Sequence, residues 1–148
     1  MKKGFSLIEL LVVVAIIGVL AGAGIVGYQG YLDGVKKDTA KNQSTQLLRA
    51  LQAAQISADA GLSGQDDCGP TDPLNACLGA LGSTLESPYQ DSSITSANIA
   101  ATCASGIHFQ TGSTPITTQM DDLSGVTLEL KACDDGVAVD DTADSITF

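Results

Sequence analysis

A long apolar run opens the chain. Leu10 to Val26 is a stretch of 17 residues without a charged side chain, and Phe5 to Ile8 precede it, separated from it only by Glu9. Together these segments reach the roughly 20 residues that are needed to span about 30 Å of hydrocarbon. The pattern predicts a transmembrane helix whose basic flank, Lys2 and Lys3, stays in the cytoplasm while the rest of the chain lies outside.

Apolar residues recur at helical spacing beyond this run. Two sets show spacings of three and four: Tyr28, Leu32, Val35 and Thr39, then Leu47, Leu51, Ala54 and Ala58. Because no proline precedes Pro70, we expect one helix from Phe5 to about Ala58, roughly 80 Å long at 1.5 Å per residue. Gly61 and Gly64 are expected to end it.

The soluble half of this helix is expected to have two kinds of surroundings. The polar stretch Lys36 to Gln46 is expected to face water or neighbouring molecules, whereas the Leu47 to Ala58 stripe is expected to be covered by the chain's own globular head. In the alternative, a break near Gly30 to Gly34 gives a membrane helix and a separate soluble helix.

The remainder predicts an α+β fold. Gly61 to about Ser105 is rich in loop-forming residues, with a short helix expected within Pro73 to Leu85. Segments with β-branched residues and turn signals between them then predict strands: Ile107–Thr111, Ile116–Met120, Val126–Cys133, Val137–Val139 and Ile146–Phe148. Val126, Leu128 and Leu130 alternate with Thr127, Glu129 and Lys131, as in a strand with one buried face. We expect an antiparallel sheet of about four strands packed on the long helix.

Glu9 is the unusual residue of the apolar run. An unpaired carboxylate within a bilayer costs on the order of 2.5 to 3.5 kcal/mol or more, so such an acid usually marks a partner or a function. No small-x-small cleavage site follows the run, and the only plausible break precedes it. Cleavage after Gly4 would give Phe5 a positive amino group that a neighbouring chain's Glu9 could meet. In the alternative, Glu9 snorkels to the interface or is protonated.

Gly4, Phe5, Ser6, Leu7, Ile8 and Glu9, followed by the apolar run, resemble the prepilin cleavage and methylation motif of type IV pilins and of the related pseudopilins of type II secretion. The resemblance covers about the first 30 residues. It implies cleavage between Gly4 and Phe5 by a prepilin peptidase, N-methylation of Phe5, and pairing of Glu9 with a neighbouring amino terminus during assembly. Many members have a proline late in this helix, whereas this chain has Gly22 to Gly27, which we expect to unwind or bend locally in a filament.

The resemblance also implies an organisation and a function. It divides the chain into a leader (1–4), an apolar transmembrane and assembly helix (5–27), an amphipathic helix (28–60) and a pilin head (61–148). The precursor would lie in the inner membrane and polymerise with itself, through the assembly machinery there, into an extracellular pilus for adhesion, motility or DNA uptake. The alternatives are a pseudopilin or minor pilin of a type II secretion-like system, or a membrane-tethered module that binds calcium or a surface partner.

The four cysteines all follow the apolar run, and an even count in an oxidising compartment predicts disulfides. Three pairings are possible. We favour Cys68 with Cys77 and Cys103 with Cys133, and the second resembles the bridge that borders the C-terminal loop of many type IV pilins. A four-cysteine zinc site is disfavoured because no close CxxC pair occurs.

Charge and the remaining candidate residues narrow the function further. Without Lys2 and Lys3, five basic and 17 acidic residues give a formal charge of −12, which disfavours a broad nucleic-acid-binding surface. Five aspartates lie within residues 134–144, which indicates a solvated face or a calcium-binding loop. This run is loosely similar to the C-terminal calcium loop of major pseudopilins. His108 has no catalytic partner at a recognisable spacing and is expected to be a surface or half-buried strand residue. We therefore predict no enzymatic activity, no cofactor and no resident metal.

Overall fold

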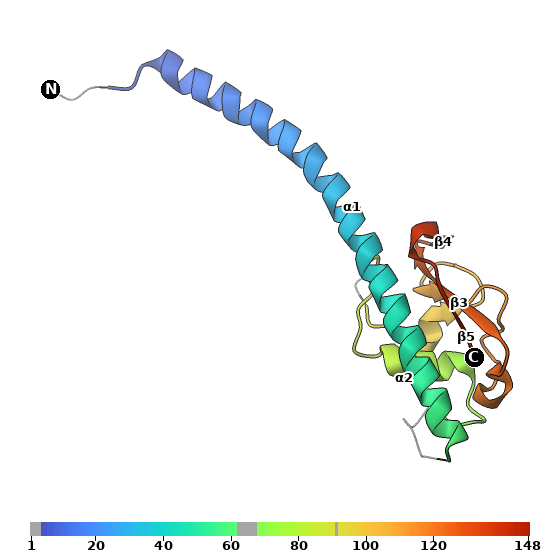
Figure 1. Cartoon of the computed structure of the whole chain (residues 1–148). Coiled ribbons are helices and arrows are strands. Elements are labelled where there is room, and N and C mark those ends of the chain that lie inside the picture. The colour runs from blue at the N-terminus through green and yellow to red at the C-terminus, as the bar shows by residue number, and fades with distance from the viewer. Residues whose placement is uncertain (1–3, 62–67, 91) are drawn as a thin grey trace. The chain divides into compact units, whose positions relative to one another are not determined.

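The computed structural model describes residues 4–61, 68–90 and 92–148, and it divides the chain into two compact units, Met1–Val35 and Lys36–Phe148. A single helix, α1 (Leu7–Asp59), belongs to both units (Figure 1). The predicted long helix is thus confirmed, and the alternative break near Gly30 to Gly34 is wrong. Gly61 follows the helix with a φ of 69°, its N–H donating to the Ala58 carbonyl, whereas Gly64 lies outside the described residues.

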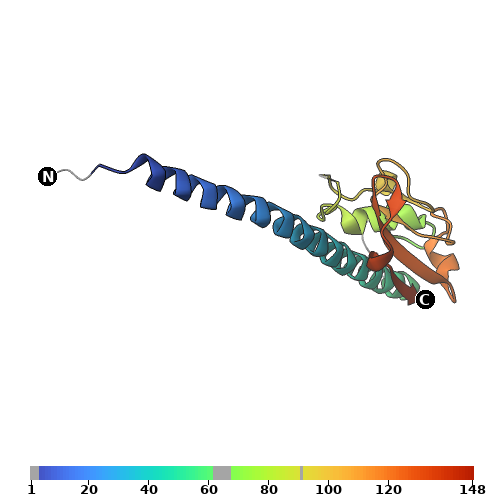
Figure 2. The same cartoon turned by 90° about the horizontal axis from the view of Figure 1, so that it is seen from above.

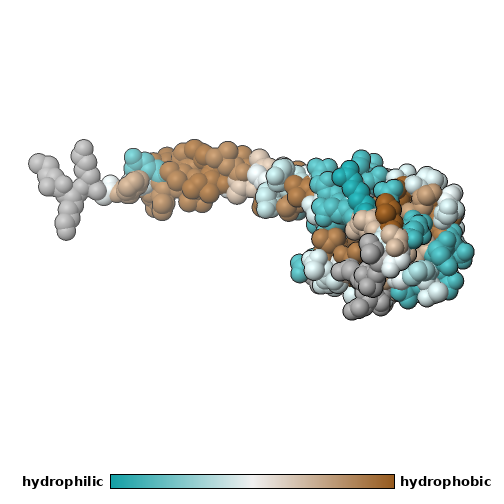
Figure 3. Space-filling view, turned by 60° about the horizontal axis from the view of Figure 1, so that its bottom comes forward, coloured by the Kyte–Doolittle hydropathy of each residue, from teal (hydrophilic) through white to brown (hydrophobic). Residues whose placement is uncertain are grey.

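In the first unit, α1 exposes its apolar side chains all round. Figure 3 shows this part of the helix as a nearly continuous hydrophobic surface. Val13 is 49% exposed and Val19 is 74% exposed, and none of the apolar window is buried within the chain. This helix is long and apolar enough to cross a membrane. It continues through Gly22 to Gly27, and the bending expected there in a filament stays a prediction.

The buried core of the described residues lies in the second unit, whose strands and short helices are shown in Figure 2. Leu47 and Leu51 of α1 are buried as expected, with Ala54 partly buried beside them. Burial also begins earlier than predicted, because Ala40 and Ser44 are fully covered. The predicted exposure of the whole Lys36 to Gln46 stretch is therefore wrong.

The reason for this earlier burial is hydrogen bonding to the head. The Gln43 side-chain amide donates to the Glu86 carbonyl at 2.7 Å, and the Ser44 hydroxyl donates to the carbonyls of Lys41 and Thr142. Hydrogen bonds of this kind offset part of the cost of burying polar side chains on a helix face.

The sheet has five described strands: β1 (Ile99–Ala100), β2 (Phe109–Gln110), β3 (Thr127–Asp134), β4 (Val137–Ala138) and β5 (Asp144–Thr147). Of these, β3 is the longest and is central. The order is β1-β2-β3-β4, and β5 also pairs with β3. All pairs are antiparallel except β1 with β2, so the sheet is mixed and larger than the four antiparallel strands expected. Leu128 and Leu130 of β3 are fully buried and Glu129 is exposed, which confirms the alternation.

The predicted short helix is present as α2 (Leu74–Gly82), whereas the strand predicted at Ile116–Met120 is wrong. The carbonyls of that segment cap α2 instead. Leu74 N–H donates to the Thr118 carbonyl at 2.8 Å, and Asn75 N–H donates to the Ile116 carbonyl at 3.0 Å. The first N–H groups of a helix lack partners within it, so this use of the segment is favourable.

Three short 3₁₀ helices complete the described structure: η1 (Ser96–Asn98), η2 (Met120–Leu123) and η3 (Asp140–Thr142). Of these, η3 separates β4 from β5 on the same side of β3. There the Thr142 hydroxyl accepts the N–H of Ala132, which lies in β3, and donates to the Val139 carbonyl. A buried hydroxyl thus replaces one bond of the strand ladder.

Candidate functional site

The segment that the sequence singles out for processing precedes α1. Gly4, Phe5 and Ser6 are non-helical and exposed, with Phe5 86% accessible. No atom lies within 4 Å of the position that a Cβ on Gly4 would occupy. The bond between Gly4 and Phe5 is therefore accessible, as a peptidase substrate requires. Lys2 and Lys3 lie outside the described residues.

Glu9 lies in the first turn of α1 and caps it. Its carboxylate Oε2 accepts the Ser6 N–H at 3.0 Å, and the N–H groups of Glu9 and Leu10 donate to the Ser6 carbonyl. Ser-x-x-Glu at a helix start is the capping-box spacing, in which the acid satisfies a donor that the helix leaves unpaired. The acid is also favoured by the helix dipole at this end.

Capping gives Glu9 a partner within its own chain, and this partner was missed from the sequence. The partners and states expected for Glu9 were a neighbouring amino terminus, the membrane interface or a proton. The signal was nevertheless present, because Ser6 lies three residues before Glu9. The new amino group that cleavage would create on Phe5 is one residue away from the bond that Glu9 accepts.

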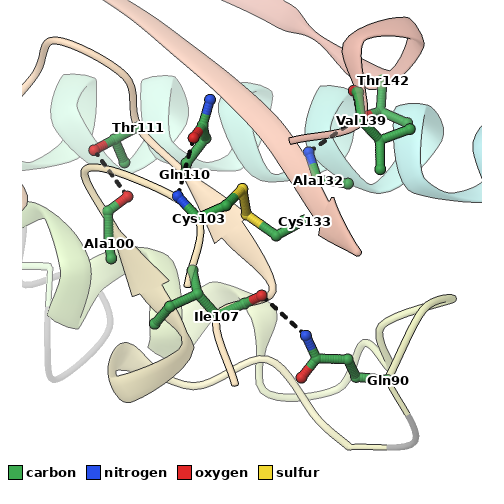
Figure 4. The surroundings of a disulfide bond; sticks show 10 residues. All are labelled: Gln90, Ala100, Cys103, Ile107, Gln110, Thr111, Ala132, Cys133, Val139 and Thr142. Atoms are coloured by element: carbon green, nitrogen blue, oxygen red, sulfur yellow. Dashed lines mark hydrogen bonds between the residues drawn. A yellow bond between two sulfur atoms is a disulfide. The ribbon is translucent and has the colours of Figure 1, made fainter. Parts of the chain in front are cut away.

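The four cysteines form two disulfides, Cys68–Cys77 and Cys103–Cys133, in the pairing favoured from the sequence. Cys133 is buried near the end of β3, and its N–H donates to the His108 carbonyl. Figure 4 shows Cys103 held by a second contact, from its N–H to the Gln110 side-chain oxygen at 3.1 Å. The bridge therefore fixes the long connection between β1 and β2 to the centre of the sheet.

The crowded C-terminal aspartates are divided among different partners. Asp141 pairs with Lys37 at 2.8 Å, and this hydrogen bond and the lysine charge lower the pKa of Asp141. Asp144 accepts a hydrogen bond from the Thr45 hydroxyl, whereas Asp134 and Asp135 lie exposed at the turn between β3 and β4. Within the described ranges, no three His, Cys, Asp or Glu side chains lie close enough to hold a metal ion.

His108 is buried, with 1% of its surface exposed, so its predicted place at or near the surface is wrong. Its Nε2 lies 3.0 Å from the Ser92 hydroxyl, and Nδ1 has no hydrogen-bond partner among the described residues. Removal from water lowers the pKa of this imidazole. The backbone explains the burial: the N–H of His108 donates to the Asn98 carbonyl, beside the pairing of β1 with β2.

The described chain thus combines a helix that is long and apolar enough to cross a membrane with a disulfide-bonded α+β head. A model of the family described as "Prokaryotic N-terminal methylation motif" matches residues 1–25. "Fimbrial protein Q" of Moraxella bovis is 41% identical over 61 residues, which cover 41% of this chain and 34% of the relative. A "Type IV major fimbrial protein FimA" of Dichelobacter nodosus is 32% identical over 100 residues, covering 60% of this chain and 64% of the relative.

Over its N-terminal part the chain is therefore similar to type IV pilins and fimbrial proteins. The chain spans about a third of the length of the first relatives it matches, 34% for both the fimbrial protein Q and the "Type IV major alpha-pilin" of Moraxella bovis. No solved structure gives a significant match to the chain.

Proposed function

We propose that this protein is the structural subunit of a type IV pilus rather than an enzyme. The observation that carries the proposal is an exposed apolar segment that lies largely within a matched N-terminal methylation motif. A soluble protein would bury such a segment, since each buried aliphatic side chain is worth about 1.5 to 3 kcal/mol. A bilayer in the precursor and the helices of other copies in the filament would provide the cover.

Processing comes first in this proposal. A prepilin peptidase cuts between Gly4 and Phe5, and the new amino group of Phe5 is methylated. The exposed, non-helical conformation of Gly4 to Ser6 supports the cut, because a peptide bond must leave helical geometry to enter a protease site.

Assembly then changes the partner of Glu9. In the isolated chain its carboxylate accepts the Ser6 N–H. In the filament it would pair with the positive amino terminus of a neighbouring copy, and an ion pair in a poorly hydrated setting is stronger than a hydrogen bond to a neutral N–H. The helical cap keeps the carboxylate satisfied until that exchange.

The precursor is proposed to lie in the inner membrane and to be passed by its assembly machinery into an extracellular filament. The acidic heads would form the outer surface. Adhesion, motility and DNA uptake are the functions that such a filament serves, and contact with the surroundings would fall to the head rather than to the helix.

The first test is mass spectrometry of protein sheared from the surface of cells that express the chain. The proposal expects an amino-terminal peptide that begins with methylated Phe5, together with two disulfides. A chain that still begins at Met1 and stays in the membrane fraction would instead indicate a tethered module and refute the proposal.

The second test asks whether Glu9 acts in assembly. Glu9→Gln keeps the size of the side chain and removes its charge, and we expect cut protein to accumulate in the membrane with few sheared filaments. Asp33→Asn is the matched control, because it removes an acid from the same helix beyond the apolar run. Equal loss of filaments in both variants would show that Glu9 has no special role.

A further inference from the structure

Two of the three tyrosines of the chain lie where the apolar part of α1 ends. Tyr28 and Tyr31 follow Val26, the last residue of the apolar run, and precede Asp33, the first charged residue after Glu9. Their side chains are 62% and 68% exposed. Neither hydroxyl has a hydrogen-bond partner among the residues that the structure describes.

The position of these tyrosines along the helix matches the thickness of a bilayer. From Leu7, where α1 begins, to Tyr28 the axial rise is about 32 Å at 1.5 Å per residue, and the hydrocarbon core is about 30 Å thick. Tyrosine prefers the boundary between hydrocarbon and headgroups, because its ring is apolar and its hydroxyl needs a polar partner.

We propose that Tyr28 and Tyr31 form an interfacial anchor that binds the phospholipid headgroup region of the outer leaflet before assembly. The inference rests on the proposed membrane precursor. The tyrosines lie one helical turn apart, so both rings project from nearly the same face, and Leu32 continues that face. Both hydroxyls thereby gain phosphate or ester oxygens as acceptors.

The anchor has a consequence for Glu9. With Tyr28 at the outer boundary, Glu9 lies about 28 Å further along the helix axis, close to the inner boundary. Its carboxylate therefore stays near the cytoplasmic headgroups, where an acid costs far less than at the bilayer centre. The two tyrosines set the depth of the helix and with it the hydration of the assembly residue.

The chain contains no tryptophan, so a single substitution introduces a clean fluorescent depth probe. The full chain would be reconstituted in phosphatidylcholine and phosphatidylglycerol vesicles, with lipids brominated either near the headgroup or near the end of the acyl chain. Tyr28→Trp and Tyr31→Trp are expected to lose more fluorescence to the shallow bromine. Val19→Trp is the control, about 14 Å further along the axis and therefore near the midplane, and it is expected to lose more to the deep bromine.

A second variant tests whether the tyrosines cause this depth. In the Val19→Trp background, Tyr28→Leu and Tyr31→Leu together keep the helix apolar but remove the polar tips, and quenching by the deep bromine is expected to fall. Tyr28→Phe and Tyr31→Phe are matched controls that keep the rings, and a smaller fall is expected.

Three results would overturn the anchor. If the deep bromine quenches both Tyr28→Trp and Val19→Trp more strongly than the shallow bromine does, the helix still spans the membrane, but the tyrosines lie inside the hydrocarbon. An unchanged depth of Val19→Trp in the leucine variant would show that the tyrosine rings do not set the depth of the helix. Quenching of Tyr28→Trp that depends only on the protein-to-lipid ratio would indicate that a second copy of the chain is the partner. Absence of lipid quenching at Val19→Trp as well would instead remove the membrane precursor itself.

Discussion

Gly79 in α2 has no room for a side chain, and the sign of its effect on stability can be predicted. A Cβ at this position would lie 2.3 Å from the backbone nitrogen of Ser96 and 3.0 Å from the carbonyl carbon of Thr95. Ordinary contacts of a Cβ begin near 3.4 Å, so the two backbones would have to separate by about 1 Å. The segment that would have to move is well held, because the Asn98 N–H donates to the Thr95 carbonyl and the Asn98 side chain accepts from the Thr95 N–H.

Two opposing contributions determine the effect of Gly79→Ala. Alanine in a helix interior is favoured over glycine by about 1 kcal/mol. Forcing an extra carbon into a packed contact costs about 1 to 3 kcal/mol, and contact with a backbone that cannot rotate away belongs at the upper end. We therefore expect Gly79→Ala to lower the free energy of unfolding by about 2 kcal/mol.

Urea denaturation of a soluble fragment that starts at Lys36 would measure this change, because that unit contains the whole buried core. Ala80→Gly in the same helix is the reference for propensity alone, with an expected loss of about 1 kcal/mol. A Gly79→Ala fragment more stable than its parent would refute the packing argument, since propensity would then have outweighed the contact.

Three further predictions concern the head. Burial lowers the pKa of His108, so its contribution to the free energy of unfolding is complete above the ordinary histidine pKa of about 6.5 and is lost as the pH falls below it. The loss is at most about 1.4 kcal/mol per pH unit. Urea unfolding measured between pH 7 and 5.5 should show this slope, and the His108→Gln variant should lack it. Replacing Cys103 and Cys133 by alanine opens a 30-residue loop and should lower the stability by about 4 kcal/mol in a thermal unfolding experiment, whereas an unchanged midpoint would contradict the loop-entropy estimate. Thr142→Val leaves the Ala132 N–H unpaired and should destabilise by about 1 to 3 kcal/mol in urea, while Thr142→Ser, which keeps the hydroxyl, should not.

The elements that could be predicted from sequence have long local patterns. The 53-residue helix follows from repeated spacings of three and four and from the absence of proline, and β3 follows from the alternation of its first five residues. By contrast, β1 has only two residues and pairs with β2 across the connection that contains Cys103. No local pattern distinguishes a two-residue strand from a loop, because the pairing that defines it is made with another segment of the chain.

The incorrect predictions have a common physical origin. Ile116–Met120 contains the β-branched residues of a strand, but its carbonyls cap α2. Ser44 belongs to a polar stretch, but its hydroxyl reaches the Thr142 carbonyl 98 residues later. His108 was expected near the surface, and its buried ring lies beside Ser92. In each case a tertiary hydrogen bond outweighs the local preference.

The candidate processing segment was predictable because its residues are consecutive. Gly4 to Glu9 carry the motif, and the cap between Ser6 and Glu9 spans only three residues. The surroundings of the apolar helix were harder to infer, since they depend on what lies outside the chain. The spacing from Leu7 to Tyr28 nevertheless carries that information, because the rise of a helix and the thickness of a bilayer are both fixed lengths.

Two of the aspartates near the C-terminus contact α1, although their crowding in the sequence suggested a shared acidic site. Thr142 interrupts the strand that runs beside β3, and the residues on either side of it turn towards α1, where Asp141 meets Lys37 and Asp144 meets Thr45. The Lys37 ion pair is exposed and contributes little by itself. The contacts made by Thr142 and Asp144 are better shielded from water and hold the last strand to the helix. Asp141 and Asp144, which are close in sequence, therefore act separately in space, at two positions along one helix.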